Sequence, residues 1–113
     1  MPQNRNKLIQ LLIGNLVNVV VHKVLEEAVT EDIMRNHYDK ESLVSLEISK
    51  KYREQINPLQ RTLPNEDVEN IKTEVLKRAK KELMYHISKG YTGIKLELIE
   101  EVLDKLLDEL KIG

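Results

Sequence analysis

Apolar residues dominate the first long segment of the chain, residues 6–29, and they fall on nearly every side of a helical projection. A helix that is apolar all round belongs in the interior, so this pattern predicts a central helix covered on two sides. One uncharged polar stripe recurs every four residues along it, at Gln10, Gly14, Asn18 and His22. Residues 16–21 also allow a strand, because the three successive valines within them lose side-chain freedom in a helix.

The second segment begins with a helix-start signal, in which Thr30 precedes two acidic residues. An apolar stripe then steps by four residues, at Val44, Ile48, Tyr52 and Ile56, with Leu43 alongside it. This spacing predicts the apolar face of a helix that stops at Asn57–Pro58, because the residue before proline avoids helical geometry. Ser42, Ser45 and Ser49 share another face, which favours either a solvated surface or a small-residue packing surface.

Two further helices follow the loop at residues 58–64. Asn65, with two acidic residues after it, marks the start of the third helix, and Lys89–Gly90 marks its end. Thr92 opens the last helix, whose apolar positions are spaced three and four residues apart, at Leu96, Ile99, Leu103, Leu106 and Leu110. Asp39 is a further candidate helix start, within the second segment. We therefore expect residues 1–113 to form a single all-α domain, a four- to five-helix bundle with short connections.

Charge and composition narrow the functional classes. The chain has 113 residues, with 18 Lys and Arg against 19 Asp and Glu, and no cysteine. The balance opposes a protein that coats nucleic acid, and the lack of thiols excludes disulfides, thiol catalysis and thiolate metal sites. The uncharged stretch Leu8–Val21 spans roughly 21 Å as a helix, short of the roughly 30 Å hydrocarbon core, and no small-residue cleavage site follows it. We expect a cytoplasmic protein without a membrane role.

Two pairs of histidine and glutamate supply the main alternative chemistry. His22 lies four residues before Glu26, and Glu82 lies four before His86, so each pair shares one helix face. If the bundle brought the pairs together, two imidazoles and two carboxylates would suit zinc or iron, or would handle a phosphate as in RNA cleavage. No serine lies in a nucleophile elbow, and no glycine pair forms a phosphate-binding loop. Whether the pairs converge stays open, and we name no catalytic residue, cofactor or metal.

Two charged segments raise the question of a charged partner. Residues 72–89 hold six basic residues against two acidic ones, which would allow weak binding to nucleic acid, although the basic positions spread around the helix. An acidic stripe in the last helix runs through Glu97, Glu101, Asp104 and Asp108. Because like charges at this spacing repel, a basic neighbour would relieve them. The basic segment just before is the obvious candidate, within the chain or across a dimer.

Association with another chain is the hypothesis that involves the largest number of residues, and it is the function that the sequence favours. The expected interface consists of Asn15, Asn18, Leu96, Ile99, Leu103, Leu106 and Leu110. The leucine-rich stripe would provide affinity, and the asparagines would fix the register, as polar core residues do in coiled coils. We expect a non-enzymatic interaction or scaffold protein that forms a homodimer, with an unidentified protein as a further partner. The enzyme built on the histidine pairs and the weak nucleic-acid binder are the alternatives.

Overall fold

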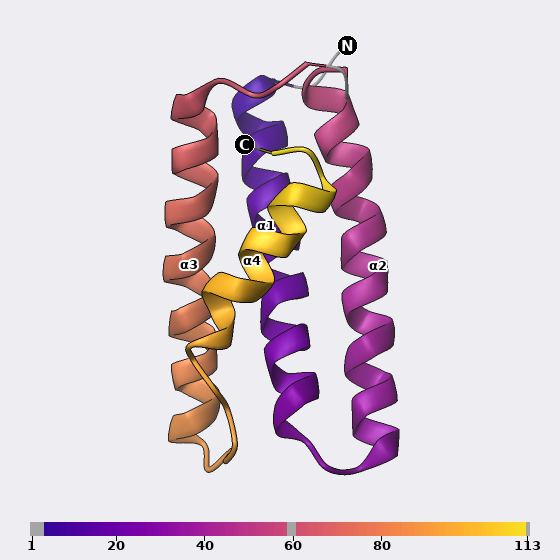
Figure 1. Ribbon diagram of the computed structural model, residues 1–113, viewed down its shortest axis with the longest axis vertical. Coiled ribbons are helices and arrows are strands. Elements are labelled where there is room, and N and C mark those ends of the chain that lie inside the picture. Colours follow the sequence, from indigo (N-terminus) through magenta and orange to yellow (C-terminus); the bar gives the residue numbers. More distant parts are fainter. Residues whose placement is uncertain (1–3, 59–60, 113) are drawn as a thin grey trace.

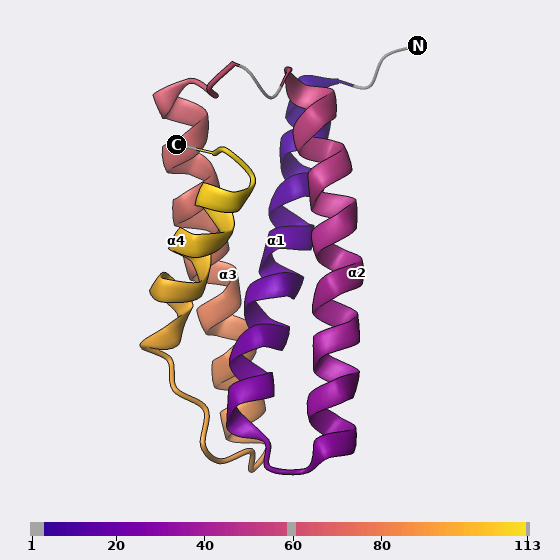
Figure 2. The same cartoon turned by 45° about the vertical axis from the view of Figure 1, so that its right-hand side comes forward.

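The computed structural model describes residues 4–58 and 61–112 and places four helices there. They are α1 (Arg5–Ala28), α2 (Asp32–Ile56), α3 (Asn65–Ser88) and α4 (Leu98–Glu109). The three long helices form one layer with α1 between α3 and α2, and the shorter α4 crosses one face of that layer (Figures 1 and 2). The all-α prediction is confirmed, and residues 16–21 are helical. Within the described ranges no strand is present.

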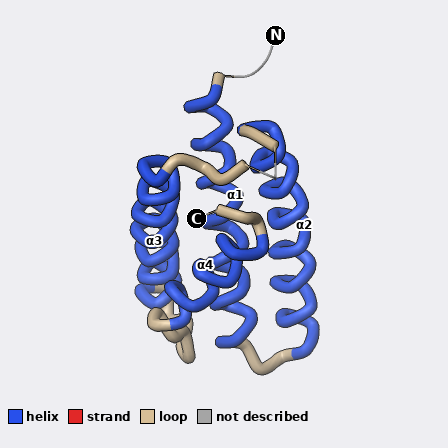
Figure 3. Tube along the Cα trace, turned by 45° about the horizontal axis from the view of Figure 1, so that its top comes forward, coloured by secondary structure: helices blue, strands red, loops and turns tan. Residues whose placement is uncertain are grey.

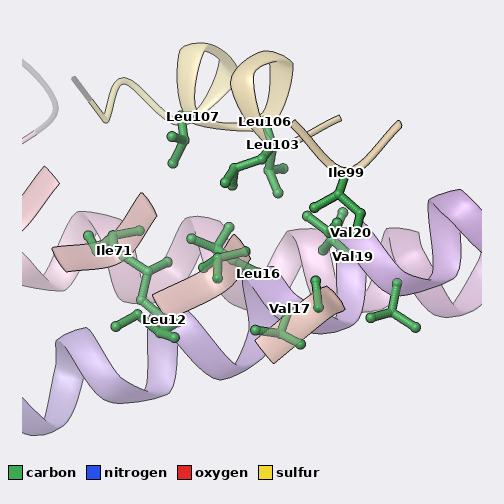
Figure 4. Close-up of a cluster of buried hydrophobic side chains, with 14 of the residues drawn as sticks. Leu12, Leu16, Val17, Val19, Val20, Ile71, Ile99, Leu103, Leu106 and Leu107 are labelled. Atoms are coloured by element: carbon green, nitrogen blue, oxygen red, sulfur yellow. The ribbon is translucent and has the colours of Figure 1, made fainter. Parts of the chain in front are cut away.

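Helix α1 forms the centre of the core, as its all-round apolar pattern predicts. Its side chains contact those of all three other helices in one buried cluster. Figure 4 shows the α4 side chains Ile99, Leu103, Leu106 and Leu107 pointing toward α1 residues that include Leu16, Val19 and Val20. Each large aliphatic side chain buried in this way contributes roughly 1.5–3 kcal/mol. The bundle therefore depends on α1 more than on any other helix.

By length and composition, α1 is also a helix that could cross a membrane. A core helix of a soluble protein meets the same criterion, because both are long and apolar. Most of α1 is covered by the other three helices.

Helix α2 packs on α1 through a face of serines, with Tyr52 and Ile56 of its apolar stripe packed on the core beside them. Ser42, Ser45 and Ser49 are buried against α1, which makes this face a small-residue packing surface. The Ser49 hydroxyl donates to the Ser45 carbonyl at 2.8 Å, so its polar group is satisfied inside the helix. The prediction that Leu43 and Val44 belong to the buried face is wrong, because they are 50% and 59% exposed.

The physical reason for this correction is the distance between the two helices. Small side chains let two helix backbones approach closely, whereas bulky side chains hold them apart. Among the helices, α2 packs closely on α1 alone. The apolar residues at the edge of its contact, Ile48, Tyr52 and Ile56, are half-buried beside the serines. The spacing of residues along the sequence does not show which face of α2 packs on α1.

Helix α4 begins at Leu98, later than the start predicted at Thr92. Residues 91–95 form an irregular connection, in which Gly93 has a φ of +80°. A Cβ atom at Gly93 would lie 3.2 Å from the Ala28 carbonyl oxygen, so this glycine allows a close approach to the end of α1. The chain thus crosses from α3 to the front of α1 before the last helix starts.

Two helices end in the same left-handed cap. Gly90 has a φ of +100° after α3, and the Tyr91 N–H donates to the His86 carbonyl at 3.2 Å. This confirms the predicted end at Lys89–Gly90. After α4 the left-handed residue is Lys111, with a φ of 57°, and the Ile112 N–H donates to the Leu107 carbonyl at 2.8 Å. The second cap places the Lys111 carbonyl beside α2, where it accepts a hydrogen bond from Arg53 at 3.1 Å.

Substitutions at Ser49 test the serine packing face. Ser49→Leu inserts a large side chain between α1 and α2 and is expected to lower the free energy of unfolding by about 1–3 kcal/mol. Ser49→Ala keeps the volume small and is expected to change it by less than about 1 kcal/mol. Leu43→Ser, on the exposed side of α2, serves as the control, with an effect of about 0.5 kcal/mol or less. Urea denaturation measures all three, and a stabilising Ser49→Leu would contradict the packing described.

Candidate functional site

The residues predicted to form an interface divide between the core and the surface. Ile99, Leu103, Leu106 and Leu110 are buried in the chain's own core, and Leu96 is half-buried beside them. Asn15 is half-buried, and its side-chain amide donates to the Leu11 carbonyl at 2.9 Å. Asn18 is exposed. The leucine-rich stripe therefore already has a partner within the chain, and an intermolecular role for these seven residues stays a prediction.

The two histidine–glutamate pairs do not assemble into a metal site. Glu26 forms an ion pair with Lys23, with 3.4 Å between the Lys23 Nζ and a carboxylate oxygen. The His86 Nδ1 lies 2.9 Å from the Glu82 backbone carbonyl oxygen, within hydrogen-bond distance. This pair therefore interacts through the main chain of Glu82. Across residues 4–58 and 61–112, no three His, Asp or Glu side chains lie close enough to hold a metal ion. His22, Glu26, Glu82 and His86 therefore do not come together as the ligand set that their spacing allowed.

The three histidines instead gather with three of the four tyrosines at one end of the bundle. His22 of α1 stacks on Tyr38 of α2, with ring centroids 5.9 Å apart, and His37 lies 5.7 Å from the same ring. The ring centroid of His86 in α3 lies 5.1 Å from that of Tyr91 and 6.2 Å from that of Tyr85, and both pairs have an edge-to-face arrangement. Burial, with Tyr91 beside it, raises the pKa of Tyr38. We call these six residues the His–Tyr cluster.

His22 is the member of the His–Tyr cluster with the least compensated polar group. Its Nδ1 atom is buried without a hydrogen-bond partner among the described residues. Burial lowers the pKa of His22, because the charged imidazolium loses solvation. Glu41 and Glu82 oppose this shift in pKa, whereas His37 and His86 add to it. The neutral imidazole is thus the form that the folded protein favours.

A buried arginine closes the opposite end of the bundle. Arg53 of α2 is fully buried, and its guanidinium donates to the Asn57 side-chain oxygen at 2.6 Å. It also donates to the carbonyls of Arg61 at 3.0 Å and Lys111 at 3.1 Å. These acceptors belong to the α2–α3 connection and to the segment after α4, which lie at the same end of the molecule (Figure 3).

The charge of Arg53 is balanced by carbonyl groups instead of by an acid. No carboxylate within the described part of the chain lies within 4 Å of its guanidinium. The carbonyls at the end of α2 and after α4 carry the partial negative charge of helix C-termini, which favours a cation there. Arg53 therefore joins three separate segments, a role that no sequence pattern suggested because arginine is rarely fully buried.

The acidic helix α4 lies beside part of the basic helix α3. Lys80 of α3 lines a surface hollow of about 410 Å³ together with Glu97 and Glu100. Lys72 shares another hollow with Asp104 and Asp108. No ion pair within 4 Å joins α3 and α4 among the described residues, so the relief of the acidic stripe by its basic neighbour stays a prediction.

The outer side of α3 keeps a positive surface. Lys77, Lys81 and Lys89 have no carboxylate within 4 Å among the residues that the structure describes. The Nζ of Lys89 lies 5.4 Å from the centroid of the exposed Tyr85 ring. This surface is small, and Arg78 is withdrawn from it by an ion pair with Glu74 at 3.2 Å.

The most exposed aliphatic surface lies on α2, opposite its serines. Ile33 is 81% exposed, and with Leu43 and Val44 it points away from α1. We call this side the α2 outer face; its residues are Ile33, Asn36, Lys40, Leu43, Val44, Glu47, Lys51 and Glu54. It forms the outer edge of the three-helix layer, where no other described helix covers it (Figure 1).

Comparisons with known proteins add no assignment to these features. The chain matches no family model, no curated protein and no solved structure. The His–Tyr cluster, the Arg53 contacts and the α2 outer face could not be read from sequence spacing, because their members come together only through the packing of separate helices.

Replacing Arg53 tests its role in joining the chain segments. Arg53→Met leaves the carbonyls of Arg61 and Lys111 buried without their donor and is expected to cost about 3 kcal/mol of folding stability. Arg61→Met, at an exposed position, is the matched control and should cost about 0.5 kcal/mol or less. Thermal and urea unfolding measure both. Equal stabilities for the two variants would contradict the contacts described.

The lowered pKa of His22 predicts a pH-dependent stability. The unfolded chain takes up a proton at His22 near the ordinary pKa of about 6.5, before the folded protein does. The contribution of His22 to the free energy of unfolding is therefore fully present above a pH of about 6.5. It is lost as the pH falls from about 6.5 toward the lower pKa of His22 in the folded protein. His22→Phe keeps a ring against Tyr38 and should flatten this part of the stability curve.

Urea unfolding at a series of pH values between about 5 and 8 compares wild type with His22→Phe. Lys77→Gln removes an exposed positive charge outside the His–Tyr cluster and controls for general charge effects. A stability difference between wild type and His22→Phe that does not change with pH would show that His22 carries no such penalty.

Proposed function

We propose that this chain is a non-enzymatic interaction protein that works through an exposed helix face and pairs with a second copy of itself. The α2 outer face is the observation that supports the proposal most directly. Three large aliphatic side chains lie on one side of a 25-residue helix and have no partner among the described residues. Aliphatic residues scattered singly over a surface are ordinary, whereas a shared exposed face is typical of an interaction site.

The packing of α2 explains why such a face exists. Its serines already provide the close contact with α1, so the aliphatic residues are not needed for the fold on that side. Leu43 and Val44 are 50% and 59% exposed, so burying them in an interface would contribute roughly half of the 1.5–3 kcal/mol that full burial of such a side chain gives. This gain is enough to oppose part of the entropy cost of association. The cytoplasm remains the proposed location.

The arrangement of titratable groups supports a binding role over an enzymatic one. The histidines are engaged with aromatic rings at one end of the bundle, and His22 favours its neutral form. The hollow that holds Lys80, Glu97 and Glu100 is open and contains none of the three histidines. An enzyme on this scaffold would need a constellation other than the two histidine–glutamate pairs.

Weak binding to single-stranded nucleic acid is the second candidate function. The exposed ring of Tyr85, with Lys89 close to it and Lys81 on the same helix, offers a stacking surface next to positive charge. This candidate uses α3, and the interaction proposal uses α2, so variants separate them. Tyr85→Ala would weaken nucleic-acid binding and leave self-association unchanged.

The oligomeric state tests the main proposal. At about 50–200 µM, native mass spectrometry and light scattering are expected to find a dimer for the wild type. Leu43→Asp combined with Val44→Asp places charges on the α2 outer face and should give a monomer of unchanged helix content. Met84→Asp, at a comparably exposed apolar position on α3, should remain dimeric. A wild-type protein that stays monomeric across this range would contradict the proposal.

A further inference from the structure

We propose that the two copies pair with antiparallel α2 helices, and that the two-fold axis passes between Leu43 and Val44. This inference rests on the proposed function and specifies its geometry. It also assigns Lys40 and Glu47 as the residues that determine how one copy recognises the other.

The charge order along the α2 outer face carries the argument. Lys40 and Glu47 are seven residues apart, which is nearly two full turns, so both lie on the middle line of this face. An axis between Leu43 and Val44 places Lys40 of one copy opposite Glu47 of the other, and the symmetry makes this contact twice. The same axis packs Leu43 against Val44 of the second copy. Opposite charges thus flank an aliphatic centre.

A parallel arrangement of the two α2 helices would place like charges opposite each other. With two parallel copies in register, each residue faces itself, so Lys40 meets Lys40 and Glu47 meets Glu47. Like charges facing each other at a helix interface are destabilising. The same holds for Lys51 and Glu54 farther along the face. Charge complementarity therefore selects the antiparallel arrangement.

The contacts within one copy leave these charges available. Lys40 has no carboxylate within 4 Å among the residues described. Glu47 meets Lys50 at 3.5 Å on the same helix, and an exposed pair of this kind contributes little and is readily exchanged. Both Lys40 and Glu47 are exposed. A second copy can approach them without displacing a strong interaction.

The position of α2 at the edge of the layer leaves room for this pairing. Because α2 packs closely on α1 alone, the helices α3 and α4 stay on the far side of each copy (Figures 1 and 2). The two layers would join edge to edge through their α2 helices.

The size of the face predicts a weak dimer. A 25-residue helix is about 37 Å long and about 11 Å wide, which gives roughly 400 Å² per copy. Stable interfaces bury about 1,200 Å² or more in total, so this pair belongs to the weak and transient class. We expect a dissociation constant of about 10–100 µM and rapid exchange between monomer and dimer.

Charge reversal tests the assigned pair of residues. Lys40→Glu and Glu47→Lys, made singly, each place like charges at both contacts and are expected to weaken dimerisation by about 5- to 10-fold. The double variant K40E/E47K restores opposite charges and should return the dissociation constant to within about 2-fold of the wild type. Lys77→Glu on α3 is the matched control and should leave dimerisation unchanged. Sedimentation equilibrium measures all four.

Cysteine cross-linking tests the direction of the helices, because the chain contains no cysteine. Val44→Cys lies next to the proposed axis and should form a disulfide-linked dimer under mild oxidation. Ile33→Cys should not, because two copies of this position lie about 31 Å apart in the antiparallel arrangement. Equal cross-linking at both positions would indicate parallel helices and overturn the inference.

The outcomes separate the geometry from the proposed function. If the wild type dimerises and the aspartate variants at Leu43 and Val44 are monomeric, the interaction proposal stands. Charge variants that dimerise like the wild type, or a double variant that does not recover, would then overturn only the antiparallel pairing. A monomeric wild type would overturn both.

Discussion

The whole architecture depends on the burial of one helix. Among the four described helices, α1 alone packs closely on each of the other three, and it is apolar on nearly every side. Most of the apolar surface that leaves water on folding is therefore arranged around a single axis. α3 and α4 also pack on each other, so they cover α1 as a unit, whereas α2 covers its remaining side alone. This asymmetry leaves α2 with a whole side directed to solvent.

Sequence periodicity predicted the elements better than their orientation. The central position of α1, the end of α3 at Lys89–Gly90 and the apolar stripe of α4 followed from spacing, because each of those faces is both apolar and buried. α2 has two faces of regular spacing, and side-chain hydrophobicity alone ranks the wrong one first. The volume of the serines, which sets how closely two backbones approach, decides the packing. The late start of α4 depends on the close contact of Gly93 with α1, which is a tertiary effect.

The chemical groups were predicted less well than the helices. His22 and His86 do approach the same end of the bundle, but each contacts a tyrosine ring, and no three His, Asp or Glu side chains of the described residues gather there to hold a metal ion. Tyr38 and Tyr91 reach that end from elements far apart in the chain, and no local pattern links them. Arg53 is likewise unremarkable in sequence, because its acceptors are backbone carbonyls that only the folded chain brings together. Sequence reasoning finds neighbours on one helix, and these groups are neighbours across several.

The serine face of α2 has a consequence for the dynamics of the bundle. Serines bury little apolar surface, so the contact between α1 and α2 contributes less hydrophobic free energy than its length suggests. Among the described helices, α2 is attached to the bundle through α1 alone, and its two ends are held by the connection at residues 29–31 and by the contacts of Arg53. Local unfolding would release α2 as a cooperative unit while α1, α3 and α4 stay associated. A second copy bound to its outer side would suppress that opening, so amide exchange in α2 would slow as the protein concentration rises.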